Sequence, residues 1–156
     1  MTHYPGFPSG TAHDSVQTKG IAEETQVKKI KDMVAEANAV VEHGPAAEML
    51  NLHGCDGVTF VDLRDPRELE RDGMIPGAFH CPRGMLEFWI DPESPYAKPQ
   101  FQSGNRFVFY CASGWRSALS AQTAQEMGLK NVSHISDGFK GWQAAGGTVA
   151  EKPKKV

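Results

Sequence analysis

Short apolar runs alternate with helical segments along most of the chain, and this alternation constrains the fold more than any other feature. Four runs have the composition of strands: Val58–Leu63, Ala78–Cys81, Arg106–Cys111 and Val132–Ile135. Near-continuous apolar strands indicate a parallel sheet that is covered by helices on both faces. The pattern therefore predicts an α/β domain.

Helical segments lie between and before these strands. Pro45 suits the first turn of a helix and begins a segment that continues to Leu52. Four further segments are predicted to be helices: Arg67–Arg71, Met85–Ile90, Trp115–Met127 and Phe139–Ala145. The stretch 91–104 holds three prolines and cannot be one regular element, so we expect a loop folded over the surface there.

The segments that flank this domain differ from it in character. Residues 1–20 lack periodicity, and we expect a flexible arm there. An amphipathic helix is predicted from Glu23 to Ala37, with an apolar stripe that packs on the domain: Val27, Ile30, Val34 and Ala37. We therefore expect an arm over 1–20, a helical extension over 21–38, one globular domain over 39–150 and a flexible basic tail over 151–156.

Length and charge narrow the classes of function. The 156 residues suit a single domain, and the net charge of −3 with scattered Lys and Arg argues against a nucleic-acid partner. No apolar run approaches the roughly 20 residues that span a bilayer, and residues 1–20 differ from a signal peptide. We therefore expect a cytoplasmic protein with no nucleic-acid or membrane partner.

The cysteines and histidines indicate neither a disulfide framework nor a metal site. Cys55, Cys81 and Cys111 are an odd number with no CxxC pair, and the six histidines have no ligand spacing. We expect reduced thiols, no metal and no cofactor. The useful question is then which thiol lies where it can react.

Cys111 lies where a buried strand runs into a short loop and a helix follows at once, in RFVFYCASGWRS. The carboxyl end of a strand is the edge at which open α/β sheets bind ligands, and the free N–H groups of the next helix point toward it. Such a helix N-terminus favours an anion by up to about 2 kcal/mol, which increases the fraction of reactive thiolate. The guanidinium of Arg116 extends this effect.

Four ordered motifs carry a resemblance over about residues 39–147. Cys111, Gly114 and Arg116 match the Cys-x-x-Gly-x-Arg active loop of rhodanese domains, and Ser117 extends the match. The stretches VDLRD at 61–65 with Glu68, GMIPGA at 73–78 with His80, and GFKGW at 138–142 are similar to the other three signatures of that family. The resemblance implies an open, mostly parallel, five-stranded sheet with helices on both faces, preceded here by the N-terminal helix.

The same resemblance implies a sulfurtransferase that carries sulfur as a persulfide. Cys111 would take a sulfane sulfur from a donor such as thiosulfate and pass it to cyanide or a thiol, and a sulfur-accepting protein is a further candidate partner. Cys111 and Arg116 are then the catalytic residues. Loop residues form the expected substrate-binding set: Ala112, Ser113, Gly114, Trp115 and Ser117. Trp115 is expected at the mouth of the pocket.

Several residues near the motifs have two interpretations. Arg116 contacts the substrate, braces the loop by pairing with a carboxylate, or does both. Asp62 and Arg64 either support the site from behind it or form an ion pair that closes a turn, and Glu68 is expected to cap or pair locally. The pair His80 and Cys81 lacks a following helix and is not expected to react.

The insert 83–104 and the added N-terminal helix depart from the commonest single-domain pattern of the family. The insert's aromatic residues are expected to form a small satellite core rather than a binding cage: Phe88, Trp89, Tyr96 and Phe101.

Two other functions are compatible with the motifs. Cell-cycle dual-specificity phosphatases have a related loop with five residues between the cysteine and the arginine, but four residues separate Cys111 from Arg116 here. A shorter loop suits one sulfur atom better than a tetrahedral phosphate. The other alternative is a non-catalytic rhodanese-like module that binds a partner or senses oxidation through Cys111.

Overall fold

The computed structural model describes residues 26–154, and the chain divides into two units, residues 1–32 and 33–156. Of the first unit, residues 26–32 are described: an irregular stretch that leads into the start of helix α2 (Ile30–Val40). The arm expected over 1–20 lies outside the described residues, as do residues 155–156 of the tail. Within 26–154, no helix is both long enough and apolar enough to cross a bilayer.

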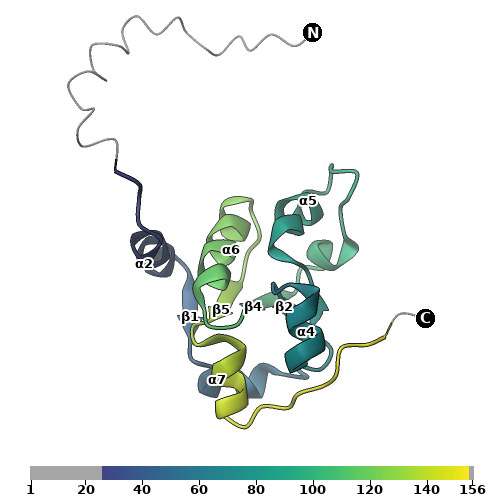
Figure 1. The fold of residues 1–156 in the computed structure, drawn as a ribbon. Helices are drawn as coiled ribbons and strands as arrows, with labels where there is room; N and C mark the ends of the chain where they lie inside the picture. The colour runs from purple at the N-terminus through teal and green to yellow at the C-terminus, as the bar shows by residue number, and fades with distance from the viewer. Residues whose placement is uncertain (1–25, 155–156) are drawn as a thin grey trace, which may run out of the picture. The chain divides into compact units, whose positions relative to one another are not determined.

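The second unit contains an open sheet of five strands that all run parallel, in the order β1-β5-β4-β2-β3 (Figure 1). The strands are β1 (Glu42–Gly44), β2 (Val58–Asp62), β3 (Phe79–His80), β4 (Arg106–Tyr110) and β5 (Val132–Ile135). The four apolar runs identified from the sequence are therefore confirmed as β2 to β5, with ends shifted by no more than one residue. The central strand β4 pairs with β2 and β5, which places its carboxyl end in the middle of the sheet edge.

Helices cover both faces of this sheet. They are α3 (Ala46–Met49), α4 (Pro66–Asp72), α5 (Leu86–Ile90), α6 (Trp115–Glu126) and α7 (Gly138–Ala144), with short 3₁₀ turns η1 (Leu50–Leu52), η2 (Arg83–Met85) and η3 (Pro99–Gln102). Figure 1 shows α5 and α6 on one side of the strands and α7 on the other. The fold class predicted from the sequence is thus confirmed.

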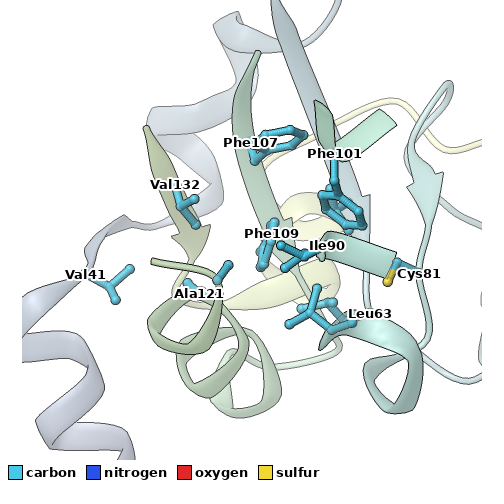
Figure 2. Packing of buried hydrophobic residues seen from close by; sticks show 12 residues of the cluster. Val41, Leu63, Cys81, Ile90, Phe101, Phe107, Phe109, Ala121 and Val132 are labelled. Atoms are coloured by element: carbon cyan, nitrogen blue, oxygen red, sulfur yellow. The ribbon is translucent and has the colours of Figure 1, made fainter. Parts of the chain in front are cut away.

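Alternation along β4 builds the two halves of the core. Phe107 and Phe109 join side chains of α5 and α6 in one buried cluster, part of which Figure 2 shows. Val108 and Tyr110 point to the opposite face, where they pack with side chains of α3 and α7. Because successive residues of a strand point to opposite faces, a strand that is buried on both faces must be apolar throughout.

The N-terminal helix differs from the predicted one. It begins at Ile30, after an irregular stretch over residues 26–29, and residues 23–25 of the predicted helix lie outside the described residues. Val27 therefore precedes the helix and is exposed, and Ile30 is 44% exposed. Only Val34 and Ala37 of the predicted stripe are buried, and they pack against Ala118 of α6. The helix also runs on through the apolar stretch 39–40 before β1 begins.

The insert 83–104 is built into the main core rather than forming a satellite core. Phe101 is buried, and its ring lies 5.5 Å from those of Phe79 and Phe107, while Trp89 packs against the same cluster. Phe88 and Tyr96 are more than half exposed and contact each other edge to face. The satellite-core prediction is therefore wrong. The insert covers the rings of Phe79 on β3 and Phe107 on β4, which would otherwise face solvent.

Residues 150–152 lie beside helix α4 and the residue Met74 that follows it. Ala150 and Met74 exchange two backbone hydrogen bonds of 2.8 Å, and Lys152 Nζ lies 3.9 Å from the carboxylate of Glu70. The flexibility expected for 151–156 stays a prediction.

Candidate active site

Cys111 follows the last residue of β4, and its sulfur is surrounded by donors of the loop and of helix α6. The backbone N–H groups of Gly114 and Ser117 donate to Sγ over 3.2 and 3.3 Å. The residue is only 1% exposed. Two N–H groups that converge on one sulfur form a site suited to a singly charged sulfur anion.

Two glycines allow the loop to take this shape. Gly114 has φ of 108°, and a Cβ there would collide with the carbonyl of Ser136. Gly138 has φ of 64° and leaves no room for a Cβ beside the carbonyl of Ala112. L side chains rarely adopt such angles, so both positions require glycine for conformation and for space.

The first residues of α7 hold the loop from behind. The N–H of Phe139 donates to the carbonyl of Cys111 over 2.8 Å, and that of Lys140 donates to the carbonyl of Ala112 over 3.2 Å. These bonds explain why the closing motif GFKGW accompanies the active loop although it lies about 25 residues further along the chain. The loop is therefore fixed by β4, α6 and α7 together.

Arg116 pairs with Glu68 rather than with the sulfur. Its two terminal nitrogens donate to the two carboxylate oxygens over 2.9 and 3.0 Å. Glu68 also accepts the N–H of Asp65 as part of a capping box that begins α4. The hydrogen bond to Arg116 lowers the pKa of Glu68 to about 2, so the pair stays ionised at neutral pH. The bracing interpretation of Arg116 is thus confirmed, and direct contact with a substrate stays a prediction.

Asp62 and Arg64 form a buried ion pair that closes the turn after β2. The guanidinium donates to both carboxylate oxygens over 2.9 and 2.7 Å and to the carbonyl of Gly73 over 2.8 Å. It also lies over the ring of Phe139 at 4.3 Å. The pair therefore links the motif VDLRD to the motifs GMIPGA and GFKGW. Its indirect role in catalysis stays a prediction.

The remaining loop residues form the outer side of the site. Trp115 is 50% exposed at the first position of α6, and Ser113 is exposed as well. Ala112 is half-buried. The indole of Trp115 is therefore accessible, and its expected place at the mouth of a substrate pocket stays a prediction.

Sequence reasoning missed two polar residues behind Ser117. The hydroxyl of Ser117 lies 3.6 Å from the sulfur of Cys111 and 2.9 Å from Nδ1 of His134, and Nε2 of His134 lies 2.7 Å from Oδ1 of Asn38. His134 is fully buried within β5. A histidine within a short strand that begins and ends with apolar residues was the signal that could have identified it.

The other cysteines lie in different surroundings. Cys55 is exposed in the turn before β2, and Cys81 is buried after β3. Burial raises the pKa of the Cys81 thiol to about 12, so this thiol is not ionised at neutral pH. His80 contacts the carbonyl of Arg64 over 2.7 Å. Within the described residues, no cluster of three or more potential metal ligands is found.

The model of the rhodanese-like domain family matches residues 45–145 of this chain. The chain therefore belongs to the rhodanese-like domain family. Strands β2 to β5 and the loop after β4 lie within the matched range, and β1 lies just before it.

Curated relatives carry two kinds of activity in their names. The chain is 26% identical over 100 residues to a mouse thiosulfate sulfurtransferase/rhodanese-like domain-containing protein 3, a match that covers 61% of this chain and 64% of that protein. It is 32% identical over 95 residues to a thiosulfate:glutathione sulfurtransferase of Saccharomyces cerevisiae, covering 58% of this chain and 68% of the relative. It is also 29% identical over 122 residues to the dual specificity phosphatase Cdc25 of Arabidopsis thaliana, covering 70% and 80%.

A solved structure from Rhodopseudomonas palustris is similar over a longer stretch. It is 58% identical, has a TM-score of 0.78 and covers 81% of this chain and 97% of its own. It is described as a protein of unknown function and a possible tyrosine phosphatase. The family model thus establishes the family, and the names of the relatives include both sulfurtransferases and phosphatases.

Proposed function

We propose that this protein is a sulfurtransferase that carries a sulfane sulfur as a persulfide on Cys111. The observation that carries the proposal is the convergence of two backbone N–H groups on one sulfur atom. Charge-assisted hydrogen bonds of this kind contribute about 1.5 to 3 kcal/mol each and would hold either a thiolate or the terminal sulfur of a persulfide. Family membership and the two sulfurtransferase relatives support it.

The proposed reaction has two displacement steps. Cys111 first loses its proton to solvent, and the thiolate attacks the outer sulfur of thiosulfate; the S–S bond of the donor breaks, and sulfite leaves with the electron pair. A thiophilic acceptor then attacks the outer sulfur of the persulfide, and Cys111 leaves as a thiolate that the loop N–H groups stabilise. Cyanide would become thiocyanate, and a thiol would become a persulfide.

The enclosure of the sulfur favours small donors. Cys111 is 1% exposed, so a donor must present a single reactive atom to it rather than a broad surface. Trp115 stands outside, where it is available to a larger acceptor such as a thiol on a peptide or on another protein. We propose that the reaction takes place in the cytoplasm, where thiol acceptors are kept reduced.

Phosphatase activity is a second candidate because of the Arabidopsis relative and the description of the R. palustris protein. A phosphatase of this kind needs an arginine that is free to bind phosphate oxygens. The pair with Glu68 uses two of the five N–H groups of Arg116, so the guanidinium keeps donors for an anion. Only four residues, however, separate Arg116 from Cys111, and a loop of this length suits one sulfur atom better than a tetrahedral phosphate. This spacing favours transfer of sulfur over hydrolysis of phosphate.

The test compares two reactions on the same preparations. Thiosulfate is supplied with cyanide or with glutathione, and hydrolysis of an aryl phosphate is measured in parallel. Cys111→Ser is expected to abolish sulfur transfer, whereas Cys81→Ser and Cys55→Ser retain most of it, since neither thiol faces a loop of N–H donors. Efficient phosphate hydrolysis without sulfur transfer by the wild type would instead support the second candidate.

A further inference from the structure

A chain of polar side chains leads from Cys111 to helix α2. It runs from the sulfur to the hydroxyl of Ser117, on to the imidazole of His134 and ends at the amide of Asn38, with separations of 3.6, 2.9 and 2.7 Å. The first three residues are at most 1% exposed, and Asn38 is half-buried. Asn38 precedes residue 45, so the last member of the chain comes from a helix outside the range that the family model matches.

The hydrogen bonds between these side chains all point the same way, from Ser117 through His134 to Asn38. The structure places Oδ1 of Asn38 beside Nε2 of His134, and an amide oxygen can only accept, so this orientation of the amide requires a proton on Nε2. Burial, with a smaller contribution from His43, lowers the pKa of His134 to about 4, and the imidazole is therefore neutral at physiological pH. A neutral imidazole has one N–H, so Nδ1 accepts the hydroxyl hydrogen of Ser117.

This direction determines what Ser117 offers to the sulfur. Its single hydroxyl hydrogen is used by His134, so a lone pair of Oγ faces Cys111 across 3.6 Å. A neutral thiol can donate its hydrogen to that lone pair. A thiolate or persulfide keeps the N–H groups of Gly114 and Ser117 but receives no hydrogen bond from the hydroxyl.

We propose that Asn38 is a positioning residue for Cys111, which holds His134 in its Nε2–H form and thereby keeps the hydroxyl of Ser117 turned away from the reactive sulfur. The consequence is a thiolate with two N–H donors rather than three hydrogen-bond donors. Because the nucleophilicity of a thiolate falls as its anion is stabilised, this arrangement preserves the reactivity of the sulfur. The inference rests on the proposed function, in which Cys111 is the reacting group.

Substitution of Asn38 by leucine is expected to reverse the direction of the hydrogen bonds among His134, Ser117 and Cys111 without adding a charge. Leucine is close in size to asparagine and accepts no hydrogen bond, so the N–H at Nε2 of His134 would be buried without a partner. The imidazole is then more stable with its proton on Nδ1, where it donates to Ser117 Oγ. The hydroxyl of Ser117 loses its acceptor and turns to the sulfur of Cys111.

Charged and titratable groups outside this chain of polar side chains lie on the neighbouring elements, and the substitution leaves all of them in place: His43 on β1, Asp62 and Arg64 at the end of β2, Glu68 on α4 and Arg116 on α6. A change in ionisation of Cys111 on substitution of Asn38 is therefore transmitted through the chain itself.

The experiment measures alkylation of Cys111 by iodoacetamide as a function of pH, read by mass spectrometry on the peptide that contains it. Asn38→Leu is expected to move the midpoint of this profile down by about one pH unit or more, since one added charge-assisted hydrogen bond changes an ionisation constant by about tenfold or more. Ala39→Leu, at the exposed neighbouring position of the same helix, is the matched control and should leave the midpoint unchanged.

Ser117→Ala separates transmission through the hydroxyl from a general disturbance of the fold. In that background Asn38→Leu should no longer move the midpoint, because no hydroxyl remains to turn. An equal shift with and without Ser117, or an unchanged midpoint in folded Asn38→Leu, overturns the proposal. Alkylation needs no sulfur transfer, so this result is independent of whether the protein transfers sulfur.

The wild-type protein provides a second readout that needs no variant. ¹⁵N chemical shifts of the His134 ring distinguish the two neutral forms of imidazole by NMR. A protonated Nε2 and an unprotonated Nδ1 support the proposal. A proton on Nδ1 contradicts it.

Discussion

The ion pair between Arg116 and Glu68 should make a measurable contribution to stability that disappears in acid. Glu68→Gln is the perturbation. Glutamine keeps one oxygen to accept the N–H of Asp65, but its amide nitrogen cannot accept from Arg116. The substitution therefore removes the brace between α4 and the active loop while it preserves most of the cap of α4.

The expected size follows from the pKa of Glu68. A fall from 4.5 to about 2 corresponds to about 3.4 kcal/mol at about 1.4 kcal/mol per pH unit, which is an upper limit. Arg116 is 41% exposed, and solvent weakens pairs of this kind toward about 0 to 1 kcal/mol. Because the contact is bidentate and Glu68 is only 19% exposed, we expect about 1 to 2 kcal/mol.

The assay is unfolding by urea between pH 6 and pH 3, with the free energy of unfolding compared between variants. The pKa of Glu68 is lowered in the folded state, so its contribution is present above about pH 4.5 and decreases as the pH falls toward 2. The advantage of the wild type over Glu68→Gln should therefore be full at pH 6 and clearly smaller at pH 3. Glu70→Gln is the matched control on the same helix, since Glu70 is 63% exposed and lies 3.9 Å from Lys152. Parallel curves for the wild type and Glu68→Gln would refute the reasoning.

Two further predictions concern the loop and the insert. In a rate assay, Gly114→Ala should slow sulfur transfer at least tenfold, because the added Cβ displaces a loop whose N–H donates to the sulfur of Cys111. The control is Gly128→Ala, since Gly128 has a similar φ but open space around it. This control should lower the free energy of unfolding by about 1 to 2 kcal/mol and leave the rate of transfer unchanged. Phe101→Ala should lower the free energy of unfolding in urea by about 3 to 5 kcal/mol, whereas Phe88→Ala, at a 52% exposed site, should stay within about 0.5 kcal/mol. Equal rates for the two glycine variants would contradict the role given to Gly114, and equal losses of stability for the two phenylalanine variants would contradict the place of Phe101 in the core.

Those parts of the fold that depend on local patterns could be predicted from the sequence. Strand β4 is identifiable because its residues are buried on both faces and are apolar in consequence. Strand β1 was not identified, because it is three residues long, lies at the edge and exposes Glu42 and His43. The start of α2 was misplaced because apolar spacing extends to Val27, which lies before the helix.

The residues of the site also fall into those that could be predicted from local spacing and those that could not. Cys111, Gly114 and Arg116 are close in the sequence, so their relation to the following helix could be predicted from their spacing. The partner of Arg116 lies 48 residues away, and Asn38 lies 96 residues from His134, so neither pairing has a spacing that a single sequence displays. The aromatic residues of the insert show the same limit, since only their place in space separates buried Phe101 from exposed Phe88.

The central claim is that Cys111 accepts sulfur, and mass spectrometry after incubation with thiosulfate tests it most directly. The folded wild type should gain the mass of one sulfur atom on the peptide that contains Cys111, and addition of cyanide should remove it. Cys55 and Cys81 should stay unmodified in the same digest, because neither sulfur faces a loop of N–H donors and Cys81 is not ionised at neutral pH. An unmodified Cys111, or a sulfur gained on Cys55 or Cys81 instead, would contradict the account.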